Sequence, residues 1–559
     1  MEMVVKKVEI LPLIKHYMQE LGLVQLFDKY MPKAKGAELA PAQVLSLMVM
    51  NIMVSAKPLY RIEEWLHDYT DGLSEERIEA NKYNDDRCAR SLDRLFDADR
   101  GSMMSELSAN AIRVHALECE RMHNDTTSVT LKGAYDTEYP DTVKITHGYN
   151  KDHRPDCKQV VFGLNVTEDG HVPLSYQLLD GNTADVSTHI PNWTELRGIL
   201  DKTNFIYVAD SKLCAYDNLN TIANQGGHFI TVVPRNFKEV KEFIARVSTG
   251  ETPDWQYSYE TPDTRRKGAM QRYLIHVGEK LSSGYRILWV YSESKARLES
   301  NQREQRLQKS ERELRQLKDR LNQRNLKSRD AIERAIASAT NGVKSYFTID
   351  LQEEIRYERV QKGRGRPSSK TQYEEKSFVY YHLDYARLET EIEKAQRTDG
   401  LFPLVDNTNL GPVEVLRTYK EQPKLEKRFN TQKSVLEVAP VFLKDPRRIE
   451  AMMFLYFVAL MLVSLIERRI RREMQEQSID SLPLRPDGAH TKKPTWRTLV
   501  DAFHGVHIAT VRQQGQLIYS KLKGLDPLRR QLLCLLNVPI KIYTELTDRW
   551  WEFLVPQYG

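Results

Sequence analysis

Cysteine is scarce in this chain. Only five cysteines occur among 559 residues, at positions 88, 119, 157, 214 and 534. They are odd in number and form no C-x-x-C pair, which argues against a disulfide framework and a zinc ribbon. The N-terminal segment also lacks an uninterrupted apolar core followed by a cleavage site, so we expect no secretory signal. The sequence therefore predicts a cytoplasmic protein.

A strong excess of one charge sign is also missing. The 82 basic residues are nearly balanced by 77 acidic ones, which leaves a net charge of +5. Any surface that binds DNA must therefore arise from local clustering of basic residues. The chain also contains no GxxxxGK[ST] loop to cradle phosphates, so the sequence gives no support to ATP-driven chemistry.

Long apolar runs are almost absent. Residues 451–466, AMMFLYFVALMLVSLI, are the exception, and they fall short of the roughly 20 residues that span a bilayer. We expect a buried helix that packs beneath the sheet carrying the active site, and no membrane partner.

The texture of the sequence changes near residue 110. Over residues 1–110 the apolar residues recur at three-to-four spacing, which is typical of short helices. This segment could be a helix-turn-helix-like DNA-binding module or a helical dimerisation domain. Over residues 111–235 the runs VVFGLNV, VPLSYQLL, FIYVAD and HFITVV predict short strands with turns between them. The expected fold class is therefore α/β.

Two aspartates each end a strand-like run. Asp125 lies in HNDTTS and Asp210 lies in IYVADSK. A third acidic residue, Glu426, falls far downstream in YKEQPKLEKRFNTQK. At 100° per residue, Glu426 would lie at about 340° and Lys433 at about 320° from Tyr419, so the three would share one helix face. Pro423 favours a helix that starts near it, which would leave Tyr419 on the approach.

This set of residues suits cleavage of a phosphodiester. Enzymes that cut this bond often place two divalent cations about 4 Å apart, one activating the attacking oxygen and one stabilising the leaving oxygen. Carboxylate oxygens are the ligands that such hard cations prefer. We expect Asp125, Asp210 and Glu426 to be the catalytic metal ligands for two Mg²⁺ ions, which Mn²⁺ can replace. Tyr419 and Lys433 would grip DNA phosphates beside them.

The ordered motifs resemble the DDE transposases of bacterial insertion sequences, in the cut-and-paste group with the signature Y-x2-R-x3-E-x6-K. Here the signature reads Tyr419, Gln422, Glu426 and Lys433, with glutamine at the arginine position. Further similar segments are NDTTS, GYNKDHRPDCKQVVFGLNV, LLDGNTAD, VADSKLC and DGLFPLVDNT.

The resemblance implies a ribonuclease-H-like catalytic core interrupted by an insertion. It also implies binding of the terminal inverted repeats of the element, metal-dependent cleavage through a hairpin intermediate, and strand transfer into target DNA. A homodimer on paired double-stranded DNA ends is expected. Two other functions stay open: a non-transposing metal-dependent nuclease of the same fold, and a catalytically silent DNA-binding regulator.

The predicted core is divided along the chain. Residues 111–235 and 396–480 would form its two parts, 236–395 the insertion and 481–559 a C-terminal appendage. Within the insertion, Leu307, Leu314 and Leu321 recur at seven-residue spacing, which suits either an intramolecular helical hairpin or dimerisation.

Two basic loops are further candidates for DNA contact. The first, GYNKDHRPD, holds Lys151, His153 and Arg154. The second, KGRGRPSSK in the insertion, holds Arg364 and Arg366. A Gly-Arg-Pro core resembles an AT-hook that enters a narrow minor groove, and the alternative is a flexible basic loop that touches phosphates nonspecifically.

Overall fold

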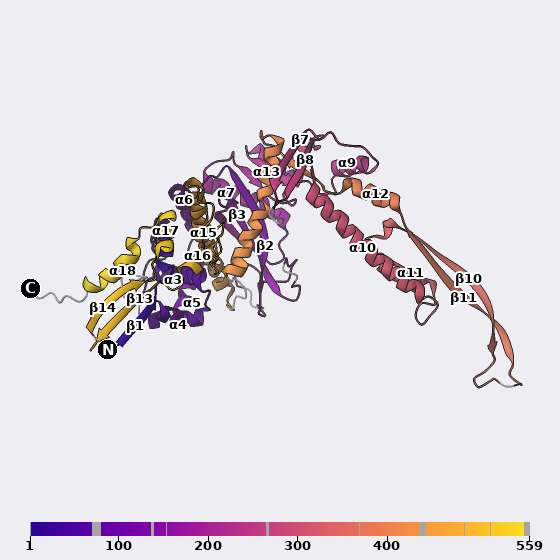
Figure 1. Ribbon diagram of the computed structural model, residues 1–559, viewed down its shortest axis with the longest axis horizontal. Coiled ribbons are helices and arrows are strands. Elements are labelled where there is room, and N and C mark those ends of the chain that lie inside the picture. Colours follow the sequence, from indigo (N-terminus) through magenta and orange to yellow (C-terminus); the bar gives the residue numbers. More distant parts are fainter. Residues whose placement is uncertain are drawn as a thin grey trace, which may run out of the picture. The chain divides into compact units, whose positions relative to one another are not determined.

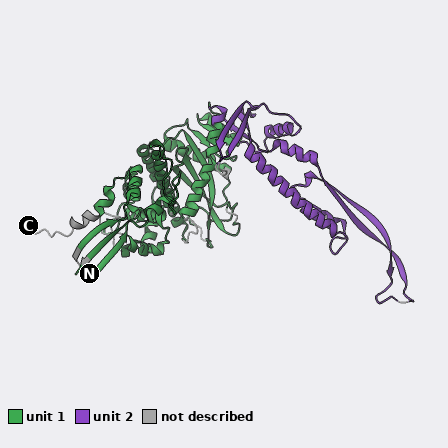
Figure 2. Ribbon diagram, viewed as in Figure 1, with its two compact units in different colours: residues 1–231, 407–409, 415–559 green, residues 232–406, 410–414 purple. Residues whose placement is uncertain are grey.

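The computed structural model describes residues 2–69, 80–135, 139–151, 154–263, 268–367, 369–436, 443–485, 487–514 and 516–552. The chain has a mixed α/β architecture (Figure 1). It folds into two compact units (Figure 2). Unit 1 comprises residues 1–231, 407–409 and 415–559, and unit 2 comprises residues 232–406 and 410–414.

The N-terminal part of unit 1 is mainly helical. Asn84 and Asp99 cap two of its helices by accepting hydrogen bonds from the backbone N–H groups of Arg87 and Ser102. The helices are α1 (Leu11–Glu20), α2 (Leu23–Tyr30), α3 (Pro41–Val54), α4 (Ile62–Asp68), α5 (Asp85–Asp97) and α6 (Arg100–His115), with 3-10 turns at Leu59–Arg61 and Ala80–Lys82.

A mixed sheet follows in unit 1. Its strands are β2 (Arg121–Leu131), β3 (Lys158–Thr167), β4 (Pro173–Leu179), β5 (Ile206–Val208) and β6 (His228–Val232), in the order β4-β3-β2-β5-β6. The β2-β3-β4 pairs are antiparallel, and the β2-β5-β6 pairs are parallel. A 3-10 turn at Asp185–Thr188 and the helices α7 (His189–Leu200) and α8 (Tyr216–Asn224) connect the parallel strands.

The apolar run of residues 451–466 lies within a buried helix, as the sequence predicts. It belongs to α15 (Pro446–Glu476), which packs on α3, α5 and β4. Tyr176 of β4 stacks on Phe457, with ring centroids 5.1 Å apart. By length and composition α15 could cross a membrane, but its most apolar stretch is entirely buried in the protein. The bent pair formed by α3 and residues 59–68 passes the same test of composition.

The two ends of the chain meet in a small sheet. Strand β1 (Glu2–Lys7) pairs antiparallel with β13 (His507–Gln513), which pairs with β14 (Gln516–Lys523). Near it lie α16 (Trp496–Phe503), α17 (Pro527–Leu535) and α18 (Lys541–Glu552). The sequence pattern of residues 1–110 predicts helices and no strand. Strand β1 was missed because its partner β13 lies about 500 residues away in the chain, so no neighbouring residues indicate the pairing.

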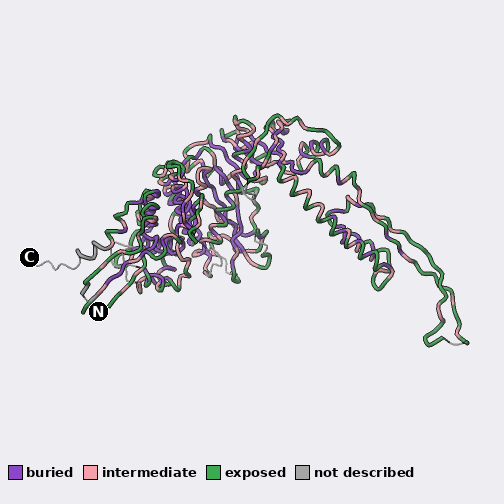
Figure 3. The backbone as a smooth tube through the Cα atoms, viewed as in Figure 1, coloured by how far each residue is buried: buried purple, intermediate pink, exposed green. Residues whose placement is uncertain are grey.

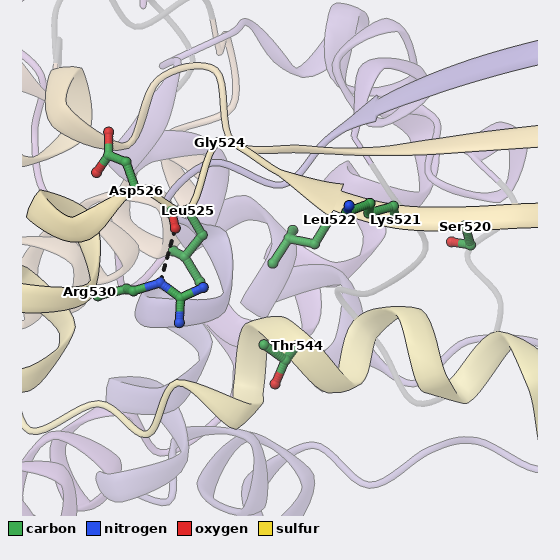
Figure 4. A pocket seen from close by; sticks show the side chains of 8 residues that line it. All are labelled: Ser520, Lys521, Leu522, Gly524, Leu525, Asp526, Arg530 and Thr544. Carbon is green, nitrogen blue, oxygen red and sulfur yellow. Dashed lines mark hydrogen bonds between the residues drawn. The ribbon is translucent and has the colours of Figure 1, made fainter.

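A pocket of about 480 Å³ lies at this C-terminal end (Figure 4). One wall comes from β14 and the turn after it, where Arg530 donates to the backbone carbonyl of Leu525 at 3.1 Å. The lining is Ser520, Lys521, Leu522, Gly524, Leu525, Asp526, Arg530 and Thr544, which includes none of the predicted site residues.

Unit 2 contains an antiparallel sheet in the order β12-β9-β8-β7. Trp289 of β9 is buried and stacks on Phe243 of α9 at 3.7 Å between ring centroids, which makes it a core residue. The elements are α9 (Lys238–Ser248), β7 (Tyr257–Pro262), β8 (Met270–Val277), β9 (Arg286–Ser292), α12 (Glu389–Thr398) and β12 (Leu401–Asp406).

Unit 2 also carries a helical hairpin and a long ribbon. Helices α10 (Glu293–Asp319) and α11 (Arg329–Ala339) pack against each other and against the ribbon of β10 (Phe347–Gln361) and β11 (Tyr373–Arg387), which follows a 3-10 turn at Lys344–Tyr346. Leu307, Leu314 and Leu321 are buried in this cluster with Leu383 of β11. The leucine stripe is therefore intramolecular. The distal half of the ribbon is exposed (Figure 3).

Candidate active site

Asp125 lies on β2, and Asp210 follows the neighbouring parallel strand β5 by two residues. In the ladder between β2 and β5, His123 lies opposite Val208. Two residues further along both segments, this register sets Asp125 opposite Asp210. Residues two apart on a strand project from the same face, and adjacent strands are about 4.8 Å apart. The two carboxylates therefore share one face at the carboxyl end of β5.

Asp125 is largely withdrawn from water, with 22% of its side chain exposed. Its Oδ1 accepts a hydrogen bond from the Thr126 backbone N–H at 2.8 Å and lies 3.5 Å from Lys151 Nζ. Burial raises the pKa of Asp125 to about 6, and the nearby charge of Asp210 adds to the rise, while Lys151 opposes it. A bound cation would therefore stabilise the ionised form of Asp125.

Asp210 is positioned by the turn that follows β5. Its Oδ1 accepts from the Lys212 backbone N–H at 3.0 Å, and its carbonyl accepts from Thr231 Oγ1 at 2.5 Å. Tyr419 lies close enough to both carboxylates for their charges to affect its pKa. Burial, followed by the charges of Asp210 and Asp125, raises the pKa of Tyr419 to about 12, so its phenol stays protonated.

Tyr419 and Glu426 lie on two helices rather than one. Helix α13 (Pro412–Glu421) ends before Pro423, and α14 (Pro423–Asn430) begins there, as the sequence predicts. Proline has no N–H to continue the helical hydrogen bonds, so the helix is interrupted between Tyr419 and Glu426. Lys433 lies in a π-helical segment, Thr431–Val435. Tyr419, Glu426 and Lys433 therefore do not lie on one regular helix, and the shared face expected for them does not follow from regular helix geometry.

Gln422 fills the position where the signature has arginine, and its side chain is buried. Its Oε1 lies 3.0 Å from His123 Nδ1, and its Nε2 donates to the Asn124 carbonyl at 2.6 Å. Burial lowers the pKa of His123 to about 4, so the imidazole is neutral. A neutral amide suits a neutral histidine here, where an arginine would be a buried charge. His123 is fully buried and held by Gln422, which gives it a structural role.

Helix α14 is anchored by a buried ion pair. Arg428 donates to Glu467 of α15 at 2.7 Å, and the exposed fraction of each side chain is 6%. Arg428 also donates to the carbonyls of Gly170 and His171. Gly170 has φ +78°, and a Cβ there would meet the Arg468 side chain at 2.7 Å. These contacts fix α14 between the turn after β3 and α15.

Polar residues on the opposite face of the sheet support the two strands. Asn124 Nδ2 donates to Asn165 Oδ1 at 2.9 Å, and Asn165 Nδ2 donates to Asn192 of α7 at 3.0 Å. His189 lies 3.3 Å from the Tyr207 hydroxyl. All these side chains are buried. This network and the role of Gln422 were not predicted from the sequence. The available signal was polar residues inside strand-like runs, namely the consecutive polar residues of NDTTS and the single asparagine of GLNV.

The remaining candidates are mostly exposed to solvent. Glu426 is exposed on α14, Lys433 is half-buried, and Arg154 is exposed and paired with Asp156 at 2.7 Å. His153 falls outside the described residues. Arg364 and Arg366 are exposed at the end of the ribbon in unit 2.

The donor chemistry of the aspartate pair suits Mg²⁺, because both side chains offer hard oxygen ligands. Across the ranges that the structure describes, no group of three or more His, Cys, Asp or Glu side chains is arranged to hold an ion. The pair of Asp125 and Asp210 is the part of the predicted triad that the fold brings together.

Comparisons with known proteins cover parts of the chain. Residues 3–109 match a family model described as Domain of unknown function (DUF4277). No curated protein matches the chain significantly. A cryo-EM structure of the piggyBac transposase synaptic complex with hairpin DNA is 10% identical, with a TM-score of 0.27, over 50% of this chain and 60% of that one.

A crystal structure of a pre-cleavage Mos1 transpososome is also 10% identical, with a TM-score of 0.14, over 35% of this chain and 61% of that one. The match thus spans less than two thirds of either solved chain. Similarity at these TM-scores does not establish a shared fold.

Proposed function

We propose that this protein is a DNA transposase. It would bind the terminal inverted repeats of an insertion sequence, cleave phosphodiester bonds at the element ends and join the freed ends to target DNA. The observation that supports this most is the placement of Asp125 on β2 and of Asp210 just after the adjacent parallel strand β5, near enough that the charge of Asp210 helps to raise the pKa of Asp125. The ordered motifs around them support the same function, including the signature at Tyr419, Glu426 and Lys433.

The proposed cofactor is Mg²⁺, as two ions, with Mn²⁺ as a substitute. Asp125 and Asp210 would hold it together with Glu426. Bound divalent ions would activate the attacking oxygen and stabilise the leaving oxygen. The high pKa of Asp125 fits this proposal, because a cation replaces the missing solvation of a buried carboxylate.

The protein's own groups would hold the DNA. Tyr419 is half-buried near both carboxylates and keeps its proton, so its hydroxyl can donate to a phosphate oxygen. Lys151 lies against Asp125, where it neutralises part of the charge that would repel a phosphate. Lys433, His153 and Arg154 are proposed to contact the DNA backbone further out.

The wider assignment follows from the resemblance. We propose a ribonuclease-H-like core with an insertion of residues 236–395, a homodimer that pairs two element ends, a hairpin intermediate during cleavage, and a location in the cytoplasm of a bacterial cell. The helices of residues 1–110 would bind the terminal repeats or join the two copies.

A paired-end assay tests the function. The full chain is incubated with Mg²⁺, a duplex carrying the inverted repeats that flank the gene, and a target plasmid. Excised ends joined to the plasmid are the expected product. Excision without joining would identify a nuclease of the same fold. Binding to the repeats without any cleavage in Mg²⁺ or Mn²⁺ would identify a DNA-binding regulator.

A further inference from the structure

Charge is sorted by position along the ribbon of β10 and β11. The shaft, defined as these two strands, has seven acidic and four basic residues, which leaves a net charge of −3. The acidic residues are Asp350, Glu353, Glu354, Glu358, Glu374, Glu375 and Asp384, and the basic ones are Arg356, Arg359, Lys376 and Arg387. The tip, defined as residues 362–367, has three basic residues, Lys362, Arg364 and Arg366, and no acidic one.

The tip is narrow and open to solvent. Residues 362–367 are all exposed. Gly363 has φ +102° and Gly365 has φ +144°, conformations that L side chains rarely adopt, so glycine is needed on either side of Arg364. Lys362 N–H donates to the Gln372 carbonyl at 2.8 Å, which closes the base of the tip.

The two arginines of the tip are available for a ligand. Over the ranges that the structure describes, neither Arg364 nor Arg366 takes part in an ion pair. By contrast, Arg356 on the shaft pairs with Glu354 at 2.7 Å and lies over the Tyr380 ring. Arg356 and Lys376 of the shaft thus pair with glutamates of the shaft, whereas Arg364 and Arg366 at the tip are exposed.

We propose that the tip inserts Arg364 and Arg366 into the minor groove of A·T-rich DNA, as a contact separate from the active site. The inference takes only the ligand, DNA, from the proposed function. A minor groove is about 6 Å wide, which suits a narrow tip that presents an extended Arg-Gly-Arg segment. Where A·T pairs narrow the groove, its negative potential is strongest and attracts arginine. The single glycine between the two arginines, Gly365, has no side chain that would have to enter the groove with them.

The shaft would hold the DNA contact away from the helices α10 and α11, against which the base of the ribbon packs. From Ile355 to Gln361 the ribbon is largely exposed, and at about 3.4 Å per residue that stretch is roughly 20 Å long. The shaft as a whole carries a net charge of −3, and its exposed distal part, residues 355–361 and 373–379, has three acidic and three basic residues and so no net charge. Because the shaft offers the phosphate backbone no excess of positive charge, the attraction is confined to the tip. The DNA would be held at the end of the ribbon that is remote from its packing against α10 and α11.

Matched double variants of the full chain test the proposal. Arg364→Ala with Arg366→Ala removes the tip charges, and Arg356→Ala with Arg359→Ala removes the same charge from the shaft. Fluorescence anisotropy in metal-free buffer gives Kd for two duplexes of equal length, one A·T-rich and one G·C-rich, over a range of salt concentrations. Circular dichroism checks that both variants are folded.

The tip variant should bind the A·T-rich duplex at least about tenfold more weakly. It should also lose the preference for A·T over G·C and reduce the salt slope by about 2. The shaft variant should stay within about twofold of wild type. A small-molecule minor-groove ligand should displace wild type from the A·T-rich duplex.

Three results would overturn the proposal. An equal loss on both duplexes would show contact with phosphates alone. Unchanged DNA binding with an altered mass in light scattering would show that the tip meets a second copy of the chain. Unchanged binding and mass would show that the tip has neither role. If Mg²⁺-dependent cleavage survives in any of these cases, the proposed function stands without the tip contact.

Discussion

Replacing Asp125 with asparagine should stabilise the metal-free protein while it abolishes cleavage. Burial raises the pKa of Asp125 from its usual 3.8 to about 6. Above pH 6 the carboxylate is ionised in both the folded and unfolded states, and its ionisation costs the folded state on the order of 3 kcal/mol. Asparagine removes that cost and keeps an oxygen for the Thr126 N–H. Losing the partly exposed pair with Lys151 offsets the gain only slightly.

The sign of the effect depends on pH in a defined way. Because the folded-state pKa lies above the unfolded one, the penalty is complete above pH 6, shrinks between pH 6 and 4, and is gone below about pH 4. The gain in the variant should follow the same course. Hydrogen exchange of peptides from β2 in EDTA at pH 8, 5 and 4 measures it. Exposed Asp156, changed to asparagine, serves as the control without a buried carboxylate.

Two results would refute this reasoning. A variant less protected than wild type at pH 8 would show that the carboxylate stabilises β2 without a cation. A gain of the same size at pH 8 and pH 4 would show that ionisation is not its cause. Adding Mg²⁺ should protect β2 in wild type and leave the asparagine variant unchanged.

Three further substitutions have expected costs. Gln422→Leu leaves His123 and the Asn124 carbonyl unpaired and should cost about 2 to 4 kcal/mol, measured by urea unfolding; a cost below about 1 would show that water replaces the amide. Arg428→Met leaves Glu467 buried with fewer partners and should cost about 3 to 5 kcal/mol in the same assay, and a gain in stability would contradict the anchoring role. Leu314→Ala should cost about 2 to 5 kcal/mol and speed hydrogen exchange in α10 and α11, whereas unchanged exchange there would place the leucine outside the core.

Much of the fold of unit 1 is visible in the sequence because its signals are local. A run such as VVFGLNV is bounded by turns and rich in branched residues, which favours a strand in any context. The interruption at Pro423 follows from a missing N–H and needs no tertiary knowledge. The burial of residues 451–466 follows from composition alone.

Other features depend on partners far away in the chain. Strand β1 exists because β13 offers it an edge, and nothing near residue 2 reveals that edge. In the sequence, Gln422 is only a departure from the signature. The structure explains it, because the glutamine side chain pairs with the buried His123. The helix-face calculation for Tyr419, Glu426 and Lys433 assumes one regular helix, while packing of α14 against β2 and α15 sets the actual directions of the side chains.

The leucine stripe in α10 shows a limit of a different kind. Seven-residue spacing is the same for a partner helix in the same chain and in another chain. Leu314 is covered by α11 and the ribbon, which sequence spacing could not distinguish from a second copy.

Mg²⁺-dependent cleavage of a labelled duplex carrying the inverted repeats tests the central claim most directly. Asp210→Asn and Glu426→Gln are compared with wild type, and Glu421→Gln, an acidic neighbour 3.6 Å from His171, is the control. Loss of cleavage in the first two variants, with DNA binding retained and the control active, is the predicted result. Cleavage by Asp210→Asn at the wild-type rate would contradict the proposed active site, and cleavage by Glu426→Gln alone would remove Glu426 as the third ligand.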